Sequence, residues 1–85
     1  MLTYLNEHCK RVAVTNEETI AKWHKVNDIL SNLDDNTFQD YIEIIGDYQW
    51  AYETAERKRT YNRVYRIAKK LGVTVNDLVL WDCIE

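Results

Sequence analysis

The stretch that decides the fold is TYNRVYRIAKKLGVTVNDLVL, residues 60–80. Its first half carries apolar residues at the three- and four-residue spacing of one helix face, at Tyr61, Val64, Ala68 and Leu71. Gly72 follows, and a glycine directly after the last helical residue is typical of a helix end. Thr74 is a good N-cap, and Asp77 puts a carboxylate in the first turn of the next helix, where the helix dipole favours it. The stretch therefore predicts two helices that meet around Gly72.

The helix that starts at Thr74 is apolar around almost its whole circumference. Its apolar residues are Val75, Leu78, Val79, Leu80, Trp81, Cys83 and Ile84. A helix packed on one side needs only one apolar stripe, and an 85-residue domain has little interior in which to surround a helix. The helix is therefore inserted between the others, or its outer face meets another chain. We expect the second outcome, a homo-oligomer or partner contact through Leu80, Trp81 and Ile84; the run from Leu78 to Trp81 would also suit a short strand.

Upstream of Gly72 the pattern predicts a long helix from Tyr48 to Leu71. It carries two apolar stripes that are rotated relative to each other, so we expect a bend or break at 57–60. A shorter helix precedes it, from Thr37 to Ile45, and Gly46-Asp47 is the expected break between the two.

Two further helices are predicted before residue 34. One follows Thr15, an N-cap that forms a capping box with Glu18; its apolar face is Ile20, Trp23, Val26, Leu30 and Leu33. The other runs from Leu2 to Ala13, with Leu2, Leu5, Cys9 and Val12 on one face. Four aromatic residues are assigned to the core: Trp23, Tyr41, Tyr52 and Tyr61. Trp50 points away from its aromatic neighbours and is predicted to be an exposed contact residue.

The composition supports this helical pattern. The chain has no proline, two glycines and an apolar fraction of 46%, and helix interiors exclude proline and glycine, whereas strand-rich folds need them at turns. We expect one all-α domain over residues 1–85, a compact bundle of four or five helices. No signal-length or membrane-length apolar run occurs, so no membrane partner is expected. Cys9 and Cys83 would suit a disulfide, but nothing else indicates secretion, and we expect a cytoplasmic protein with reduced thiols.

Charge is distributed unevenly along the chain. Eight acids and no basic residue lie between Lys25 and Arg57, and seven of the eleven basic residues then fall between Arg57 and Lys70 without an acid. Four of these lie within roughly 60° of one another on a helix and form the basic stripe: Arg59, Arg63, Arg66 and Lys70. Such a row could be a solvated face balanced by nearby acids, or it could bind nucleic-acid phosphates or an acidic protein.

An acidic face is predicted on the preceding helices. It consists of Asp34, Asp35, Asp40, Glu43 and Asp47. Such a face could mimic nucleic-acid phosphates and occupy a basic groove of another protein, or it could simply be a solvated surface.

Enzyme and metal motifs are missing from the sequence. The two glycines are isolated, so there is no glycine-rich phosphate loop, and Ser31, the only serine, lacks the flanking glycines of a nucleophile elbow. The histidines and cysteines follow no zinc-ligand spacing. We therefore expect a non-enzymatic protein without a cofactor or metal.

Residues 64–78, VYRIAKKLGVTVNDL, resemble the closing helices of lambda-repressor-type helix-turn-helix domains. The resemblance implies a five-helix bundle that binds DNA. It would make Thr37–Ile45 the second helix, place Gly46 at the turn and make Tyr48–Arg59 the recognition helix.

The sequence leaves two functions open. The first is a small regulatory or inhibitory protein that acts on a macromolecular partner, most often another protein. Small acidic helical chains without cofactor motifs are frequent among phage and mobile-element accessory proteins, and this frequency, rather than any residue, suggests a protein of that type. The alternative is a helix-turn-helix-like DNA-binding transcriptional regulator, with the basic stripe on the DNA backbone.

Overall fold

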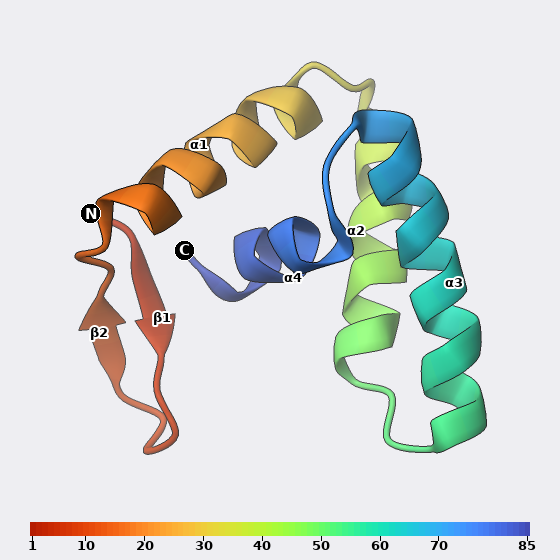
Figure 1. The fold of residues 1–85 in the computed structure, drawn as a ribbon, viewed down its shortest axis with the longest axis horizontal. Helices are drawn as coiled ribbons and strands as arrows, with labels where there is room; N and C mark the ends of the chain where they lie inside the picture. Colours follow the sequence, from red (N-terminus) through yellow and green to blue (C-terminus); the bar gives the residue numbers. More distant parts are fainter.

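Four helices and one two-stranded hairpin make up the fold (Figure 1). The computed structural model describes all 85 residues. The elements are β1 (Thr3–Leu5), β2 (Arg11–Ala13), α1 (Glu17–Ser31), α2 (Asp35–Gln49), α3 (Thr54–Leu71) and α4 (Val75–Cys83). The predicted all-α bundle is thus confirmed, with a small sheet added at its beginning.

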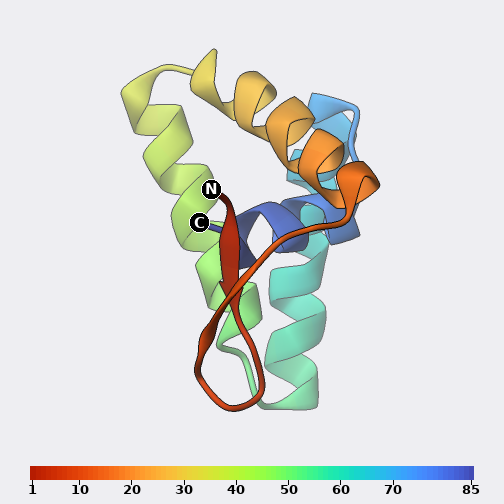
Figure 2. The ribbon, with the colours of Figure 1, turned by 90° about the vertical axis from the view of Figure 1, so that its left-hand side faces the viewer.

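The short helix α4 lies at the centre of the molecule. α2 and α3 run antiparallel side by side, and α1 arches over α4 from the other side (Figures 1 and 2). The buried cluster draws on all four helices: Val26, Leu30, Ile45, Val64, Ile67, Ala68, Val75 and Leu78. An almost wholly apolar helix is stable in water here because three other helices cover it.

The sequence-based reason for expecting Leu80, Trp81 and Ile84 to face a second chain no longer holds, because helices of the same chain cover α4; the contact itself stays a prediction. Ile84 is buried, and Leu80 and Trp81 are half-buried within the monomer. The Trp81 indole packs edge-on against Phe38, with ring centroids 6.1 Å apart, and its Nε1 donates to Asn27 Oδ1 at 3.3 Å. The alternative outcome, insertion of this helix between the others, is the one observed.

The predicted first helix is also wrong, because residues 3–13 form the β hairpin. The Asn6 side-chain oxygen accepts hydrogen bonds from the backbone N–H groups of His8 (2.9 Å) and Lys10 (3.0 Å). Cys9 adopts a left-handed φ of 58° in the same turn. Asparagine bonds of this kind stabilise turns in competition with helix. The apolar pattern that predicts a helix here rests on four residues in a short segment, and a pattern of that length also arises in a hairpin.

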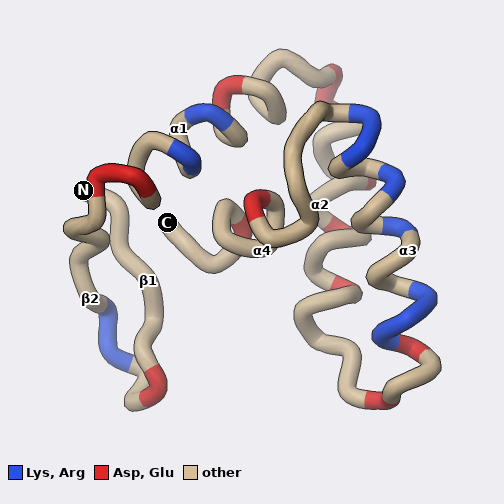
Figure 3. The backbone as a smooth tube through the Cα atoms, in the orientation of Figure 1, with Lys and Arg blue, Asp and Glu red and all other residues tan.

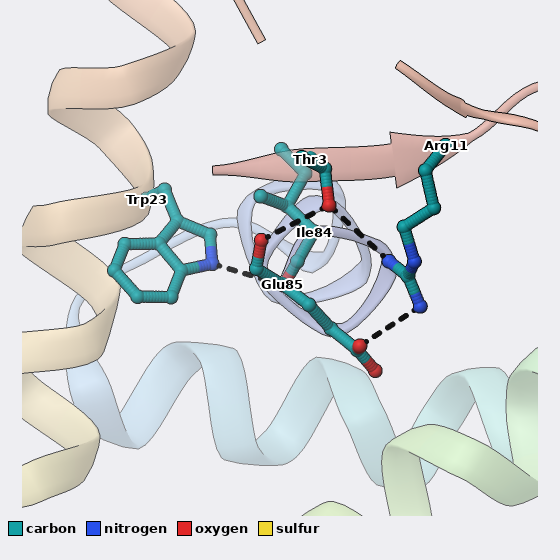
Figure 4. A network of polar contacts seen from close by, with 5 residues as sticks. All are labelled: Thr3, Arg11, Trp23, Ile84 and Glu85. Atoms are coloured by element: carbon teal, nitrogen blue, oxygen red, sulfur yellow. Dashed lines mark hydrogen bonds and ion pairs between the residues drawn. The ribbon is translucent and has the colours of Figure 1, made fainter. Parts of the chain in front are cut away.

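The hairpin is held by the last residues of the chain (Figure 4). Thr3 and Glu85 exchange two backbone hydrogen bonds of 2.7 and 2.8 Å, next to an antiparallel bridge between Tyr4 and Ile84. Arg11 pairs with the Glu85 carboxylate at 2.9 Å. A two-stranded hairpin is only marginally stable on its own. The pairing of residues 84–85 with β1 therefore stabilises it.

Trp23 joins α1 to the same corner, rather than lying in the core as predicted. It is half-buried, outside the central cluster, and its Nε1 donates to the Ile84 carbonyl at 3.3 Å (Figure 4). The N-cap of α1 is Asn16, one residue after the predicted cap Thr15, and its side chain accepts from the Thr19 N–H at 3.1 Å.

The break between the two long helices lies at 50–53. α2 continues through Gly46 to Gln49, so neither the predicted break at Gly46-Asp47 nor the predicted bend at 57–60 is present. The helix-turn-helix alignment would place its turn at Gly46, and no turn occurs there; the resemblance itself stays a prediction. In the observed turn Ala51 is buried, and its carbonyl accepts from the Arg57 guanidinium at 2.9 Å. Tyr52, assigned to the core, is 85% exposed.

The two helix ends in the deciding stretch are as predicted. Gly72 ends α3 in the left-handed region with φ 74°. Thr74 and Asp77 form a reciprocal capping box at the start of α4, with bonds of 3.1 and 3.2 Å.

Candidate nucleic-acid interface

The outer side of α3 is a continuous basic surface. Its core-facing side carries Val64, Ile67 and Ala68, all buried. The basic stripe (Arg59, Arg63, Arg66 and Lys70) lies on the opposite side, and all four residues are exposed. Basic residues follow α3 along its length at the edge of the molecule (Figure 3). The helical spacing of the sequence therefore brings the four predicted residues onto one face.

No acid of the chain forms an ion pair with these cations. The molecule has two ion pairs, Glu7 with His8 and Arg11 with Glu85, and both lie away from α3. Of the seven basic residues of α3, only Arg57 makes a hydrogen bond within the protein. The nearby acids do not balance the stripe by direct contact, so its guanidinium and ammonium groups remain free to bind an external anion.

A tyrosine row lies along one flank of α3, separated from the basic stripe by Lys58, Asn62 and Lys69; it consists of Tyr48, Tyr61 and Tyr65. The rings of Tyr48 and Tyr61 meet edge-on, with centroids 5.9 Å apart, and those of Tyr61 and Tyr65 stack at 6.3 Å and an interplanar angle of 25°. The Arg57 guanidinium lies over Tyr48 at 4.8 Å, and Lys69 Nζ over Tyr65 at 5.9 Å. Aromatic and cationic groups therefore alternate along this flank.

The sequence pattern does not indicate the tyrosine row as a surface, and the prediction that Tyr61 lies in the core is wrong. In the structure Tyr61 is 42% exposed and Tyr65 is 49% exposed. The signal available in the sequence was the spacing of four between these two tyrosines, which places them on neighbouring turns of the same side. Lys58, Asn62 and Lys69 share that side, so it is polar as well as aromatic.

Three shallow hollows meet along the tyrosine row. One, of about 320 Å³, lies between Tyr61, Tyr65 and residues 73–76, which comprise the end of the turn after α3 and the first residues of α4. The next, of about 600 Å³, is lined by Asn62, Tyr65, Arg66, Lys69 and Lys70. A third, of about 400 Å³, reaches from Asn62 and Tyr61 to Arg57 and Tyr48. Because neighbouring hollows share lining residues, the flank is one extended uneven surface, and basic residues line each of its hollows.

The acidic face is divided between two roles. Asp34 is the N-cap of α2: Thr37 donates its hydroxyl (2.6 Å) and its N–H (3.2 Å) to the carboxylate, and these bonds lower the pKa of Asp34 below its usual value. Asp35 lies in the first turn of the same helix. Asp40, Glu43 and Asp47 are exposed and, at spacings of three and four, share the outer side of α2. Only these last three therefore form a free acidic surface.

An exposed aromatic pair lies in the turn between α2 and α3. Trp50 is 75% exposed, as predicted, and Tyr52 is 85% exposed. Both line a hollow of about 520 Å³ together with Leu5 of β1 and Asp82 of α4. Burial raises the pKa of Asp82, against the opposing effect of a 3.5 Å hydrogen bond from Gln49 Nε2.

The remaining chemical groups are dispersed. No three His, Cys, Asp or Glu side chains come together in a way that would hold a metal ion. Cys9 and Cys83 are both exposed and unpaired. None of the four helices combines the length and the apolarity needed to cross a lipid bilayer.

Comparison with protein-family models, curated proteins and solved structures finds no match to this chain. Function must therefore be inferred from the surfaces described above.

Proposed function

We propose that the protein is a non-enzymatic binding protein that holds nucleic acid by its phosphates, through the basic stripe of α3. The observation that carries the proposal is the row Arg59, Arg63, Arg66 and Lys70, exposed and without any acidic partner in the molecule. Arginine and lysine side chains that neutralise phosphates release the counterions condensed on the nucleic acid, and this release drives binding.

The shape of the molecule supports contact along α3. The helix has 18 residues and lies at the edge of the fold (Figure 1), so its outer side spans about 27 Å. The free acids Asp40, Glu43 and Asp47 lie on α2 and would be repelled by phosphates. We therefore expect the nucleic acid to approach from the side of α3, with α2 facing away from it.

The test is a titration of a fluorescently labelled DNA duplex over a range of salt concentrations. Four phosphate contacts give an expected slope of log K against log salt of about −3 to −4. Arg63→Glu with Arg66→Glu should abolish binding. Lys22→Glu with Lys25→Glu, two exposed positions on α1, changes the net charge equally and should weaken binding only slightly. An absence of binding at low salt and micromolar protein, both to the duplex and to a single strand of the same length, would refute the proposal.

A protein partner is the second candidate, favoured by the exposed pair Trp50 and Tyr52. Tryptophan and tyrosine are enriched in binding hot spots. A pull-down from lysate with and without nuclease separates the two candidates: bands that survive nuclease and are lost with Trp50→Ala plus Tyr52→Ala would favour the protein partner. The regulatory or inhibitory role that the sequence suggests stays a prediction under either candidate.

A further inference from the structure

We propose that the flank of α3 that carries the tyrosine row binds single-stranded nucleic acid, with unpaired bases stacked on Tyr61 and Tyr65. The inference deepens the proposed function and rests on it, because two cations of the basic stripe, Arg66 and Lys70, also line the hollow beside Tyr65 and would hold the backbone there. It specifies which form of nucleic acid is bound and which residues select it.

The exposure of the two rings is the first observation. A small domain is expected to bury its large aromatic side chains, which stabilise the core most. Tyr61 and Tyr65 instead leave 42% and 49% of their surface in water on successive turns of α3. Neither hydroxyl hydrogen-bonds to the protein, so no internal polar contact explains their position. Their arrangement, stacked at 6.3 Å and 25°, presents two nearly parallel rings to a ligand.

The cations around the rings are the second observation. Lys69 lies over Tyr65, and the hollow beside that ring is lined by Arg66, Lys69 and Lys70. Proteins that bind single strands combine a basic groove for the backbone with aromatic rings for the bases. The Lys69 ammonium on an exposed ring is held weakly compared with a stacked base. A base can therefore displace Lys69 from the ring and leave it free to bind the adjacent phosphate.

The shape of the flank favours single strands over duplexes. The Tyr61–Tyr65 hollow is closed on one side by residues 73–76 and has a volume of about 320 Å³, at the lower end of ligand-sized cavities. A base reaches a ring inside such a hollow only if its own face is free. In a duplex both faces of each base are already stacked, whereas an unpaired strand can turn its bases outward. Each base stacked on a ring is expected to raise the affinity roughly 5- to 150-fold.

Three labelled probes test the inference: a 20-nucleotide oligothymidine, an abasic strand with the same number of phosphates, and a 20-base-pair duplex. The wild-type protein should bind oligothymidine at least tenfold more tightly than the abasic strand, since only the former can stack. Tyr61→Leu with Tyr65→Leu keeps apolar bulk and should remove that difference, while the affinity for the duplex stays unchanged. Tyr61→Phe with Tyr65→Phe should retain the difference, because phenylalanine also stacks.

A matched control and two contrary outcomes complete the test. Tyr4→Leu removes an exposed tyrosine outside the flank and should leave all three affinities unchanged. Equal wild-type affinity for oligothymidine and the abasic strand would overturn the inference, and so would a leucine variant that still discriminates between them. In either case duplex binding with its salt slope would leave the proposed function standing. If none of the probes binds, the proposed function fails together with the inference.

Discussion

At the scale of single residues, Asp82 ionises in a position that water only partly reaches. Burial raises its pKa, and the nearby Glu85 carboxylate raises it further, while the hydrogen bond from Gln49 opposes both effects. Asp82 also lies in the last turn of α4, where the helix dipole disfavours a negative charge. Its ionised form is therefore less stable in the folded chain than in the unfolded chain.

We predict that Asp82→Asn stabilises the protein at pH 7. A raised folded-state pKa makes the folded chain bind more protons, so the contribution of Asp82 to stability is complete below its usual pKa of 3.8 and is lost as the pH rises through the folded value. Asparagine stays neutral and can still accept from Gln49. Urea unfolding at pH 7 should show the variant to be more stable, and the difference should vanish near pH 3. Equal stability of the two proteins at pH 7 would mean that the Asp82 carboxylate is as well hydrated in the fold as in the unfolded chain.

At the scale of elements, the sequence predicts helix ends well where a local side chain fixes them. Gly72, Thr74 and Asp77 act through their own backbone geometry and nearest hydrogen bonds, so the signal is complete in the sequence. The turn at 50–53 depends instead on the burial of Ala51 and on a contact from Arg57, which only the packed molecule supplies. The rotated apolar stripes predict a break in this region, but at residues 57–60 rather than at the observed residues 50–53.

Replacement of glycine by alanine is predicted to change the free energy of unfolding in opposite directions at the two glycines. Gly46 lies inside α2, and an added Cβ would meet no atom within 4 Å beyond the neighbouring backbone of its own helix, so Gly46→Ala should raise the free energy of unfolding by about 0.5–1 kcal/mol. Gly72 has equal space but a φ of 74°, so Gly72→Ala should lower the free energy of unfolding by about 1 kcal/mol. Thermal unfolding of both variants measures the contrast. Destabilisation by Gly46→Ala would mean that α2 is interrupted there, as the sequence pattern suggested.

At the scale of the whole molecule, the sequence left open what covers the apolar α4. The periodicity of a sequence shows how many sides of a helix are apolar. Which other helices cover those sides depends on the path of the whole chain, which periodicity does not contain. The same limit applies to the candidate site: the spacing of the basic stripe was sufficient to place Arg63 and Arg66 together, since one helix carries both. The pairing of Tyr48 with Tyr61 could not be predicted, because Tyr48 lies on α2 and the contact requires the antiparallel packing of the two helices.

The central position of α4 predicts that a cavity there weakens the whole fold. Leu78 is fully buried, so Leu78→Ala should cost about 3 kcal/mol, a large part of the roughly 4–13 kcal/mol expected for a domain of 85 residues. Leu5→Ala, the same change at a side chain that is 56% exposed, should cost under about 0.5 kcal/mol.

Native-state hydrogen exchange measures how this loss is shared among the helices. Because α1, α2 and α3 all pack on α4, the most protected amides of each should lose protection by the same factor in Leu78→Ala, as expected when exchange requires global unfolding. A loss confined to α1 would show a different organisation. α2 and α3 would then form a unit that is stable by its own packing, and α4 would serve mainly to attach α1 to it. The basic stripe and the tyrosine row, which both lie on that unit, would in that case persist when α1 detaches.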